Sequence, residues 1–249
     1  MREADLLLGG RLRLHQATSG HRAGTDAILL AAAAPPTDGT ILDAGAGTGA
    51  AGLALGQRCP AASLTLVEID PDQAALCRDN LALNGMAARG RVVACDLTSA
   101  KARRAADLAD GKAEVLLTNP PWLEPGKARL SPDDDRARAH AQAPGVDLAD
   151  WIRACTALTA PGGTLVLVHR ADRLGDILAA LGGRFGHVAI RPVHPRAEAP
   201  AHRLLVTARK GSRAPLTLLP GLVLHDSGGR FTPQAEALHR GETCLAAGQ

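Results

Sequence analysis

Aromatic side chains are scarce in this chain of 249 residues, which has two Trp, two Phe and no Tyr. Proteins that hold single-stranded nucleic acid stack its bases on aromatic rings, so any stacking surface here must be small. Trp122 is the candidate for such a contact. Trp151 lies in a helical pattern, and we expect it to pack against the core.

Cysteine and histidine do not occur at metal-binding spacings. The five cysteines are odd in number, widely separated and without a C-x-x-C pair, which argues against a disulfide framework and a zinc knuckle. The nine histidines include no H-E-x-x-H sequence. We therefore expect no bound metal, and buried free thiols at Cys59, Cys77, Cys95, Cys155 and Cys244.

Long apolar segments are also missing. No run approaches the roughly 18 to 20 residues that a membrane-spanning helix requires, and the N-terminal stretch MREADLLLGGRLRL lacks the apolar core of a signal peptide. With 46% hydrophobic and 21% charged residues, the composition is that of a globular protein. We expect a cytoplasmic protein, and the sequence does not indicate its oligomeric state.

Net charge is only +3, but positive charge is concentrated in one stretch. Between residues 184 and 213, seven Lys and Arg and three His accompany one acid, Glu198. Such a stretch either holds a phosphate backbone or forms a solvated basic face, and the sequence leaves both open. The candidate RNA contacts are Arg191, Arg196 and Arg203.

Strand-like and helix-like segments alternate along most of the chain. This alternation predicts an α/β fold: a Rossmann-like, doubly wound, mostly parallel sheet of about seven strands, with the last strand antiparallel. The predicted strands are TILDAG (40–45), SLTLVEID (63–70), GRVVACD (90–96), AEVLLTNPP (113–121), GGTLVLVHR (162–170), HVAIRPV (187–193) and HRLLVTARK (202–210).

Shorter segments flank this alternating core, which we assign to residues 37–213. Residues 1–36 predict a hairpin around a Gly-Gly pair and a helix capped by Thr25 or Asp26. Residues 214–249 predict an appendage packed on the core. The loop 123–145 is long for a compact domain, and long loops beside a ligand edge tend to be lids or substrate contacts.

Three glycines at alternate positions, Gly45, Gly47 and Gly49, separate the first core strand from a helix. Glycine permits a tight turn and the close approach of a ligand, although a dinucleotide-binding loop has a similar pattern. Asp43 stands just before these glycines, where it would repel a pyrophosphate but attract a cationic amino group. This arrangement favours a ligand with an ammonium group.

Acidic residues also end the next two strands. Glu68 stands where an acidic side chain accepts hydrogen bonds from both hydroxyls of a ribose, and Asp96 is placed to reach an adenine amino group. Parallel sheets bind ligands at the carboxyl ends of their strands. A ligand with an ammonium, an unphosphorylated ribose and an adenine fits S-adenosylmethionine better than NAD.

The sequences LDAGAGTG, VEID, CDL and NPPW at four successive strand ends resemble the class I S-adenosylmethionine-dependent methyltransferases. A dinucleotide-dependent dehydrogenase is the main alternative, and the sequence offers no evident acid/base pair for hydride transfer. The resemblance implies cofactor binding by Asp43, Gly45, Gly47, Thr48, Gly49, Glu68, Ile69, Asp96, Leu97 and Asn119.

The sequence NPPW, residues 119–122, predicts a rigid backbone at the end of its strand, because proline fixes φ and forces the preceding residue into an extended conformation. Plain strand termination is the alternative. The Asn119 side-chain oxygen and the Pro120 carbonyl would accept both N–H groups of an amine and turn its lone pair toward the methyl group. Trp122 would stack on a planar acceptor. The catalytic candidates are Asn119, Pro120, Pro121 and Trp122.

The N/D-P-P-Y/F/W signature is typical of methyltransferases that act on amino nitrogens, with Tyr or Phe more usual than Trp122. GGRLRLHQ, GHRAGTDAILLAAA and the tail from Arg203 to Gly241 resemble the bacterial tRNA (adenine-N6) methyltransferases that modify the adenine beside the anticodon of valine tRNA. The resemblance implies a tRNA partner. It also implies that Thr25 and Asp26 help to close the cofactor site, whereas a plain helix cap is the alternative.

Other acceptors fit the chain less well. Release-factor glutamine-N5 enzymes carry a sizeable helical domain before the catalytic one, and ribosomal-RNA guanine-N2 enzymes often have a duplicated domain. Neither is evident here. A small-molecule acceptor would suit the modest net charge, but adenine N6 in tRNA is the predicted target.

Overall fold

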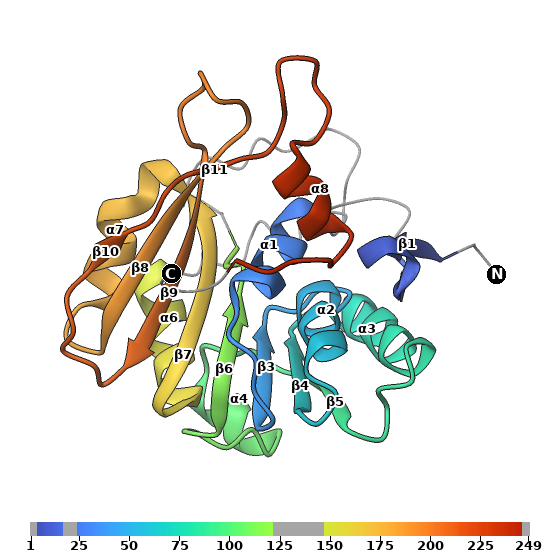
Figure 1. Cartoon of the computed structure of the whole chain (residues 1–249). Coiled ribbons are helices and arrows are strands. Elements are labelled where there is room, and N and C mark those ends of the chain that lie inside the picture. Colours follow the sequence, from blue (N-terminus) through green and yellow to red (C-terminus); the bar gives the residue numbers. More distant parts are fainter. Residues whose placement is uncertain (1–3, 17–23, 122–146, 246–249) are drawn as a thin grey trace, which may run out of the picture.

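The computed structural model describes residues 4–16, 24–121 and 147–245, so Trp122 and the loop 123–145 lie outside the described residues. The described chain forms a two-stranded hairpin and a nine-stranded sheet with helices on both faces (Figure 1). The predicted α/β fold is confirmed. The sheet exceeds seven strands because two short ones, β10 (Thr217–Leu218) and β11 (Leu222–Val223), extend one edge.

The seven longer strands follow the order β5-β4-β3-β6-β7-β9-β8. As predicted, the last of them, β9, is antiparallel to both its neighbours, and the other pairs are parallel. The strand order reverses between β3 and β6, which is where such sheets bind ligands. The strands are β3 (Thr40–Ala44), β4 (Ser63–Glu68), β5 (Gly90–Ala94), β6 (Ala113–Thr118), β7 (Thr159–Arg170), β8 (Phe185–His194) and β9 (Arg203–Lys210).

Two hydrophobic cores lie on opposite faces of the sheet. Successive side chains of a strand point to opposite faces, so Ile41 and Val115 enter one core while Leu42 and Leu116 enter the other. The first core is covered by α1 (Thr25–Ala33), α2 (Ala50–Arg58), α3 (Pro71–Leu83) and α8 (Pro233–His239). The second is covered by α6 (Leu148–Leu158) and α7 (Leu174–Leu181), and by Ala106 and Leu108, which follow α4 (Ala100–Ala105).

Helix starts follow local capping chemistry, with one difference from the prediction. The Asp70 carboxylate accepts hydrogen bonds from the first free N–H groups of α3, and Pro71 follows as a residue that needs no N–H. For α1, however, Gly24 occupies the cap position, so the prediction of a Thr25 or Asp26 cap was wrong. Both residues lie within the first turn, where their side chains reach other partners.

The N-terminal hairpin has the predicted form. β1 (Asp5–Leu7) and β2 (Leu12–Leu14) are antiparallel, and a short 3₁₀ turn (Leu8–Gly10) joins them. Leu12 and Leu14 are fully buried in the first core. The hairpin is therefore fixed to the helical layer over the sheet.

The C-terminal residues return to the same core. Leu222, Ala235 and Leu238 are buried in it, and Figure 1 shows α8 (red) beside α1 (blue). Beyond α8, the Leu245 N–H donates a hydrogen bond of 2.9 Å to the Ala32 carbonyl of α1. The C-terminal segment therefore packs on α1, whereas the N-terminal hairpin packs on α2, α3 and α8.

All five cysteines are free, and three of them, Cys59, Cys77 and Cys155, are buried as predicted. Burial raises the pKa of the Cys155 thiol to about 12, which leaves it protonated and unreactive. Cys95 is only partly buried. Cys244 is exposed, so the prediction of burial was wrong there, because it follows α8 at the surface.

No helix in the described part of the chain combines the length and apolar character needed to cross a membrane.

Candidate functional site

A pocket of about 290 Å³ lies between the C-terminal ends of β3 and β6, where the strand order reverses. Its volume is near the lower end of the range for small-molecule sites. The walls come from the glycine loop, the first turns of α1 and α2, and the end of β6. The lining residues are Gly24, Asp26, Ala27, Leu30, Asp43, Gly45, Ala46, Gly47, Thr48, Ala50, Ala51, Gln73 and Asn119.

The glycine loop adopts backbone conformations that few other residues tolerate. Gly45 and Gly49 have φ values of 75° and 90°, in the left-handed region that favours glycine. A Cβ atom on Gly45 would also lie 3.1 Å from the Trp151 ring, and one on Gly49 would lie 2.8 Å from Cys77 Sγ. Close packing beneath the loop therefore requires glycine at both positions.

Asp43 is a buried acid on the pocket wall. Its Oδ2 accepts a 2.8 Å hydrogen bond from the Gly52 N–H at the start of α2, and the side chain is almost wholly screened from solvent. Burial raises its pKa to about 7; the Gly52 hydrogen bond opposes this rise, and the nearby negative charge of Glu68 adds to it. A cationic group in the pocket would stabilise the ionised form.

Glu68 joins the glycine loop to the end of β4. One carboxylate oxygen accepts from the Gly47 N–H at 2.8 Å, and the other accepts from the Asp70 N–H at 2.9 Å. The following side chain, Ile69, is 65% exposed although it is large and apolar. The end of β4 therefore presents a fixed carboxylate and an open apolar surface side by side.

Asp96 and Leu97 follow β5, beyond the pocket lining. Asp96 Oδ1 accepts from the Thr98 N–H at 2.8 Å and from the Thr98 hydroxyl at 2.7 Å. Leu97 is buried, and its carbonyl accepts a hydrogen bond from Arg103. The acids Asp43, Glu68 and Asp96 thus end three adjacent strands, as the sequence predicts, but only Asp43 lines the pocket.

Asn119 also lines the pocket, directly after β6. The preceding Thr118 is fully buried; its hydroxyl donates to the Ala44 carbonyl at 2.9 Å and accepts from Trp151 Nε1 at 2.8 Å. Trp151 packs in the core as predicted. These contacts fix the tip of β6 against the glycine loop.

The three neighbours of Asn119 in the NPPW sequence have different surroundings. Pro120 is buried and Pro121 is exposed. Trp122, the predicted stacking residue, lies outside the described residues.

The two polar side chains in the first turn of α1 lie on different sides, one at the pocket and the other against α8. Asp26 lines the pocket and pairs with Arg203 of β9, with 3.3 Å between Oδ2 and Nε and side-chain exposures of 21% and 22%. Thr25 Oγ1 instead lies 3.1 Å from His239 Nε2 of α8. Of the two residues, Asp26 alone contributes to the pocket wall.

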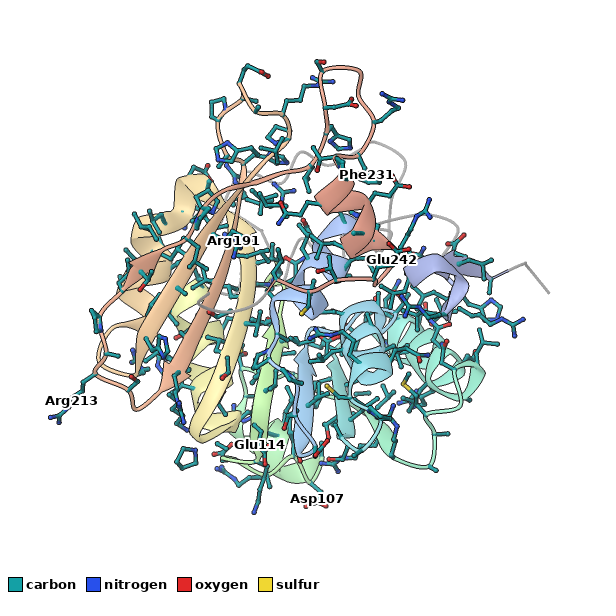
Figure 2. All side chains as sticks on the ribbon, in the orientation of Figure 1. Asp107, Glu114, Arg191, Arg213, Phe231 and Glu242 are labelled. Carbon is teal, nitrogen blue, oxygen red and sulfur yellow. The ribbon has the colours of Figure 1, made fainter. Side chains whose placement is uncertain are left out.

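The basic stretch 184–213 does not form one continuous face at the pocket. β8 and β9 pair antiparallel, with Phe185 opposite Lys210 and Val193 opposite Arg203. At about 3.3 Å per residue, the two ends lie roughly 25 Å apart. Figure 2 accordingly shows Arg213 near the lower end of the sheet, away from Arg191.

The three candidate RNA contacts differ in their surroundings. Arg191 donates a 2.8 Å hydrogen bond to the Pro220 carbonyl, and Arg203 is held by Asp26. Arg196 follows β8 at the pocket end of the sheet and is exposed. It is the most accessible of the three.

Several pocket residues were missed by the sequence analysis. Gln73 could have been predicted as a pocket residue, because it lies in the first turn of the helix that follows the second core strand, near a ligand-binding edge. Ala27, Leu30 and Ala51 look like ordinary core residues in the sequence, and only the folded chain places them at the pocket. Within the described ranges, no group of three or more His, Cys, Asp or Glu residues is arranged to hold a metal ion.

Comparison with known proteins connects this site to methyl transfer. Residues 20–132 match the family model of the methyltransferase small domain. The tRNA1(Val) (adenine(37)-N6)-methyltransferase of Aeromonas hydrophila is 32% identical, over 76% of this chain and 77% of the relative. The enzyme of the same name from Porphyromonas gingivalis strain W83 is 29% identical, over 92% of this chain and 91% of the relative.

A solved structure agrees with these sequence matches. The structure of a predicted O-methyltransferase from Agrobacterium tumefaciens is 37% identical and covers 88% of this chain and 98% of its own, with a TM-score of 0.73. The match to the family model covers the residues that line the pocket, from Gly24 to Asn119. The chain is therefore an S-adenosylmethionine-dependent methyltransferase, and it belongs to the family that includes the curated tRNA1(Val) (adenine(37)-N6)-methyltransferases.

Proposed function

We propose that this protein methylates the exocyclic N6 of an adenine in tRNA, and that the anticodon-loop adenine of valine tRNA is its target. The observation that carries the proposal is that Asn119 and the buried acid Asp43, which come from the neighbouring strand ends of β6 and β3, line one pocket. An acceptor amine held at Asn119 would then lie close to a cationic cofactor held at Asp43. The relatives named above support tRNA as the substrate.

The residues around the pocket suit S-adenosylmethionine chemically. Asp43 is a buried carboxyl group whose ionised form needs a cation, and the ammonium group of the cofactor would supply one. Glu68 is held by two backbone N–H groups, and its remaining lone pairs would accept the ribose hydroxyls. Ile69 and Asp96 would meet the adenine face and its amino group.

Thr48, Leu97 and the pocket glycines would hold the cofactor through their backbone. Gly45 and Gly47 line the pocket, and Gly49 begins α2. The resulting close approach of the chain would place the cofactor against the start of α2, where backbone N–H groups point outward. Asp26 would close the methionine end, whereas Thr25 would act indirectly through α8.

Asn119 and Pro120 would orient the amine. When bound, S-adenosylmethionine supplies a methyl group already activated by its positive sulfur. The Asn119 side-chain oxygen and the Pro120 carbonyl would accept the two N–H groups of the adenine and so direct the nitrogen lone pair at the methyl carbon. Methyl transfer would form the N–C bond while the electron pair of the broken C–S bond goes to sulfur, and the surplus proton would pass from the nitrogen to solvent.

Placement and desolvation supply the rate enhancement in this scheme, because the adenine amine needs no strong base. Pro121 would stiffen the tip of β6, and Trp122 would stack on the target base. An adenine in a structured RNA must leave its stack to reach Asn119. We assign the reaction to the cytoplasm, where its tRNA substrate is found.

The test is to identify the methylated product. The protein is incubated with methyl-labelled S-adenosylmethionine and, separately, with unmodified total tRNA, ribosomes, release factors and a small-molecule extract. Label recovered as N6-methyladenosine from tRNA alone is the expected result. Label in ribosomal guanine, in a release-factor glutamine or only in a small molecule would replace the proposed acceptor with the one found.

A further inference from the structure

Two asparagines one turn apart, Asn80 on α3 and Asn84 directly after its end, hold the backbone of the N-terminal hairpin. Asn80 is fully buried; its Oδ1 accepts from the His15 N–H at 2.7 Å, and its Nδ2 donates to the His15 carbonyl at 2.9 Å. Asn84 repeats this pattern on Arg13, at 2.9 Å and 2.7 Å. Each side-chain amide therefore binds both backbone groups of one residue.

These amides take the place of a neighbouring strand. Arg13 and His15 are two residues apart, so their backbone groups face the same edge of the hairpin, opposite to the edge that pairs with β1. An isolated two-stranded hairpin is marginally stable in water. The asparagines satisfy its second edge and fasten it to α3.

Asn80 differs from Asn84 by one further contact. Its Nδ2 also donates a 2.9 Å hydrogen bond to the carbonyl of Thr48, in the glycine loop that lines the pocket. Both Nδ2 hydrogens and the oxygen of Asn80 are thereby used, and the buried amide has one orientation that satisfies all three bonds. Asn84 instead places its second donor on the Asn80 carbonyl, within α3.

We propose that Asn80 is a positioning residue that couples the N-terminal hairpin to cofactor binding. One buried amide holds the His15 backbone and the Thr48 carbonyl together, so the shape of the glycine loop depends on a docked hairpin. By linkage, a ligand that orders the loop also stabilises the hairpin. The inference rests on the cofactor site proposed above but not on the identity of the methyl acceptor.

The two asparagines provide a matched pair of variants. Asn80→Ala and Asn84→Ala each remove the contacts to one hairpin residue, but only Asn80→Ala releases Thr48. We expect Asn80→Ala to weaken binding of S-adenosylhomocysteine about tenfold or more in isothermal titration calorimetry, because it leaves a buried carbonyl unpaired next to the site. Asn84→Ala should change the affinity less than about twofold, although both variants lower the melting temperature.

Equal losses of affinity in both variants would show that hairpin docking, and not the contact between Asn80 and Thr48, acts on the site. No loss in either variant would show that Asn80 only holds the hairpin. Either result would overturn the proposed role of Asn80. If Asn80→Ala does not fold, hydrogen exchange on the unaltered protein decides instead. Saturation with S-adenosylhomocysteine should then slow exchange of the His15 amide relative to the Leu6 amide, and unchanged His15 exchange would reject the proposal. Both readouts measure binding, so they hold whether or not tRNA proves to be the acceptor.

Discussion

Asn119 is the residue on which the proposed chemistry depends most directly. We expect Asn119→Ala to lower kcat by on the order of 10²-fold or more, as is seen when one hydrogen-bonding group that acts in the transition state is removed. Asn119→Asp keeps a side-chain oxygen at the same place and should retain more activity. Single-turnover methylation of tRNA measures both, with cofactor affinity as the control. Near-normal turnover in Asn119→Ala would remove this residue from the mechanism.

We expect Asp43 to link cofactor binding to the pH dependence of stability. Its pKa rises from 3.8 to about 7 on folding, so between these values the folded state holds a proton that the unfolded chain releases. The contribution to stability is therefore full below pH 4 and is lost as the pH rises through 7, with a slope of at most about 1.4 kcal/mol per pH unit.

Asp43→Asn keeps the acceptor for the Gly52 N–H but cannot ionise. Without cofactor, we expect the stability of this variant relative to the unaltered protein to increase as pH rises from 4.5 to 8. We also expect the variant to bind S-adenosylmethionine more weakly than the unaltered protein does. Urea unfolding of both proteins across that range isolates the Asp43 contribution, because the other groups titrate in both. A stability difference that does not change with pH would contradict the raised pKa.

Some residues of the site could be predicted from the sequence and others could not. Asp43, Asn119 and the glycines carry chemistry that is unusual at a strand end, and the sequence therefore places them near the pocket. The sequence indicates a role for Asn80 less clearly. Asparagine is a poor helix former, so its presence inside a helix suggests that its side chain has a partner. The partners themselves, Thr48 and His15, depend on packing between distant segments.

At the scale of elements, β3, β6 and α6 meet in one buried chain of hydrogen bonds. Trp151 on α6 donates to Thr118 at the end of β6, which donates to Ala44 at the end of β3. This chain sets the distance between the Asn119 tip and the glycine loop. It acts on the chemistry through position and not through contact with substrate.

Trp151→Phe removes the first donor of this chain and keeps an aromatic ring beneath Gly45. We expect a loss of about 0.5–1.5 kcal/mol in stability, and a fall in kcat larger than any change in cofactor affinity. Thr118→Val removes the middle group of the chain. The double variant should lose less kcat than the sum of the two single losses predicts. Strictly additive effects on kcat in this double-mutant cycle would show that the two side chains act separately.

The α/β elements were predictable because alternation of strands and helices is a strong periodic signal. Short elements were not. The two-residue strands β10 and β11 exist only because the chain beyond β9 lies along the edge of β8, and no local pattern encodes that placement. The cap of α1 was mispredicted because Thr25 and Asp26, good cap residues by type, are used for contacts with His239 and Arg203 instead.

At the scale of the whole molecule, the divided basic stretch yields a matched test of RNA binding. Arg196 is exposed at the pocket end, whereas Arg213 is exposed at the far end of the sheet. We expect Arg196→Ala to weaken tRNA binding and to reduce the slope of log affinity against log salt by about one. Arg213→Ala should change neither quantity. Equal effects from both would indicate an RNA path along the full sheet.

We propose that residues 37–213 form the methyltransferase core and that residues 1–36 and 214–249 extend it as parts of one cooperative unit. Leu14 and Leu238, one from each extension, are buried in the same core cluster as α2. We expect a single unfolding transition, identical by circular dichroism and by tryptophan fluorescence. Separate transitions for the two probes would show that an extension unfolds independently.

The packing of the C-terminal segment on α1 has a consequence during protein synthesis. α1 supplies Asp26 and Leu30 to the pocket wall, but its neighbours α8 and Leu245 are translated about 200 residues later. At elongation rates of roughly 5–20 residues per second, that interval lasts tens of seconds. Until α8 and Leu245 leave the ribosome, α1 lacks these contacts, so a nascent chain completes the support of its pocket only after both have been made.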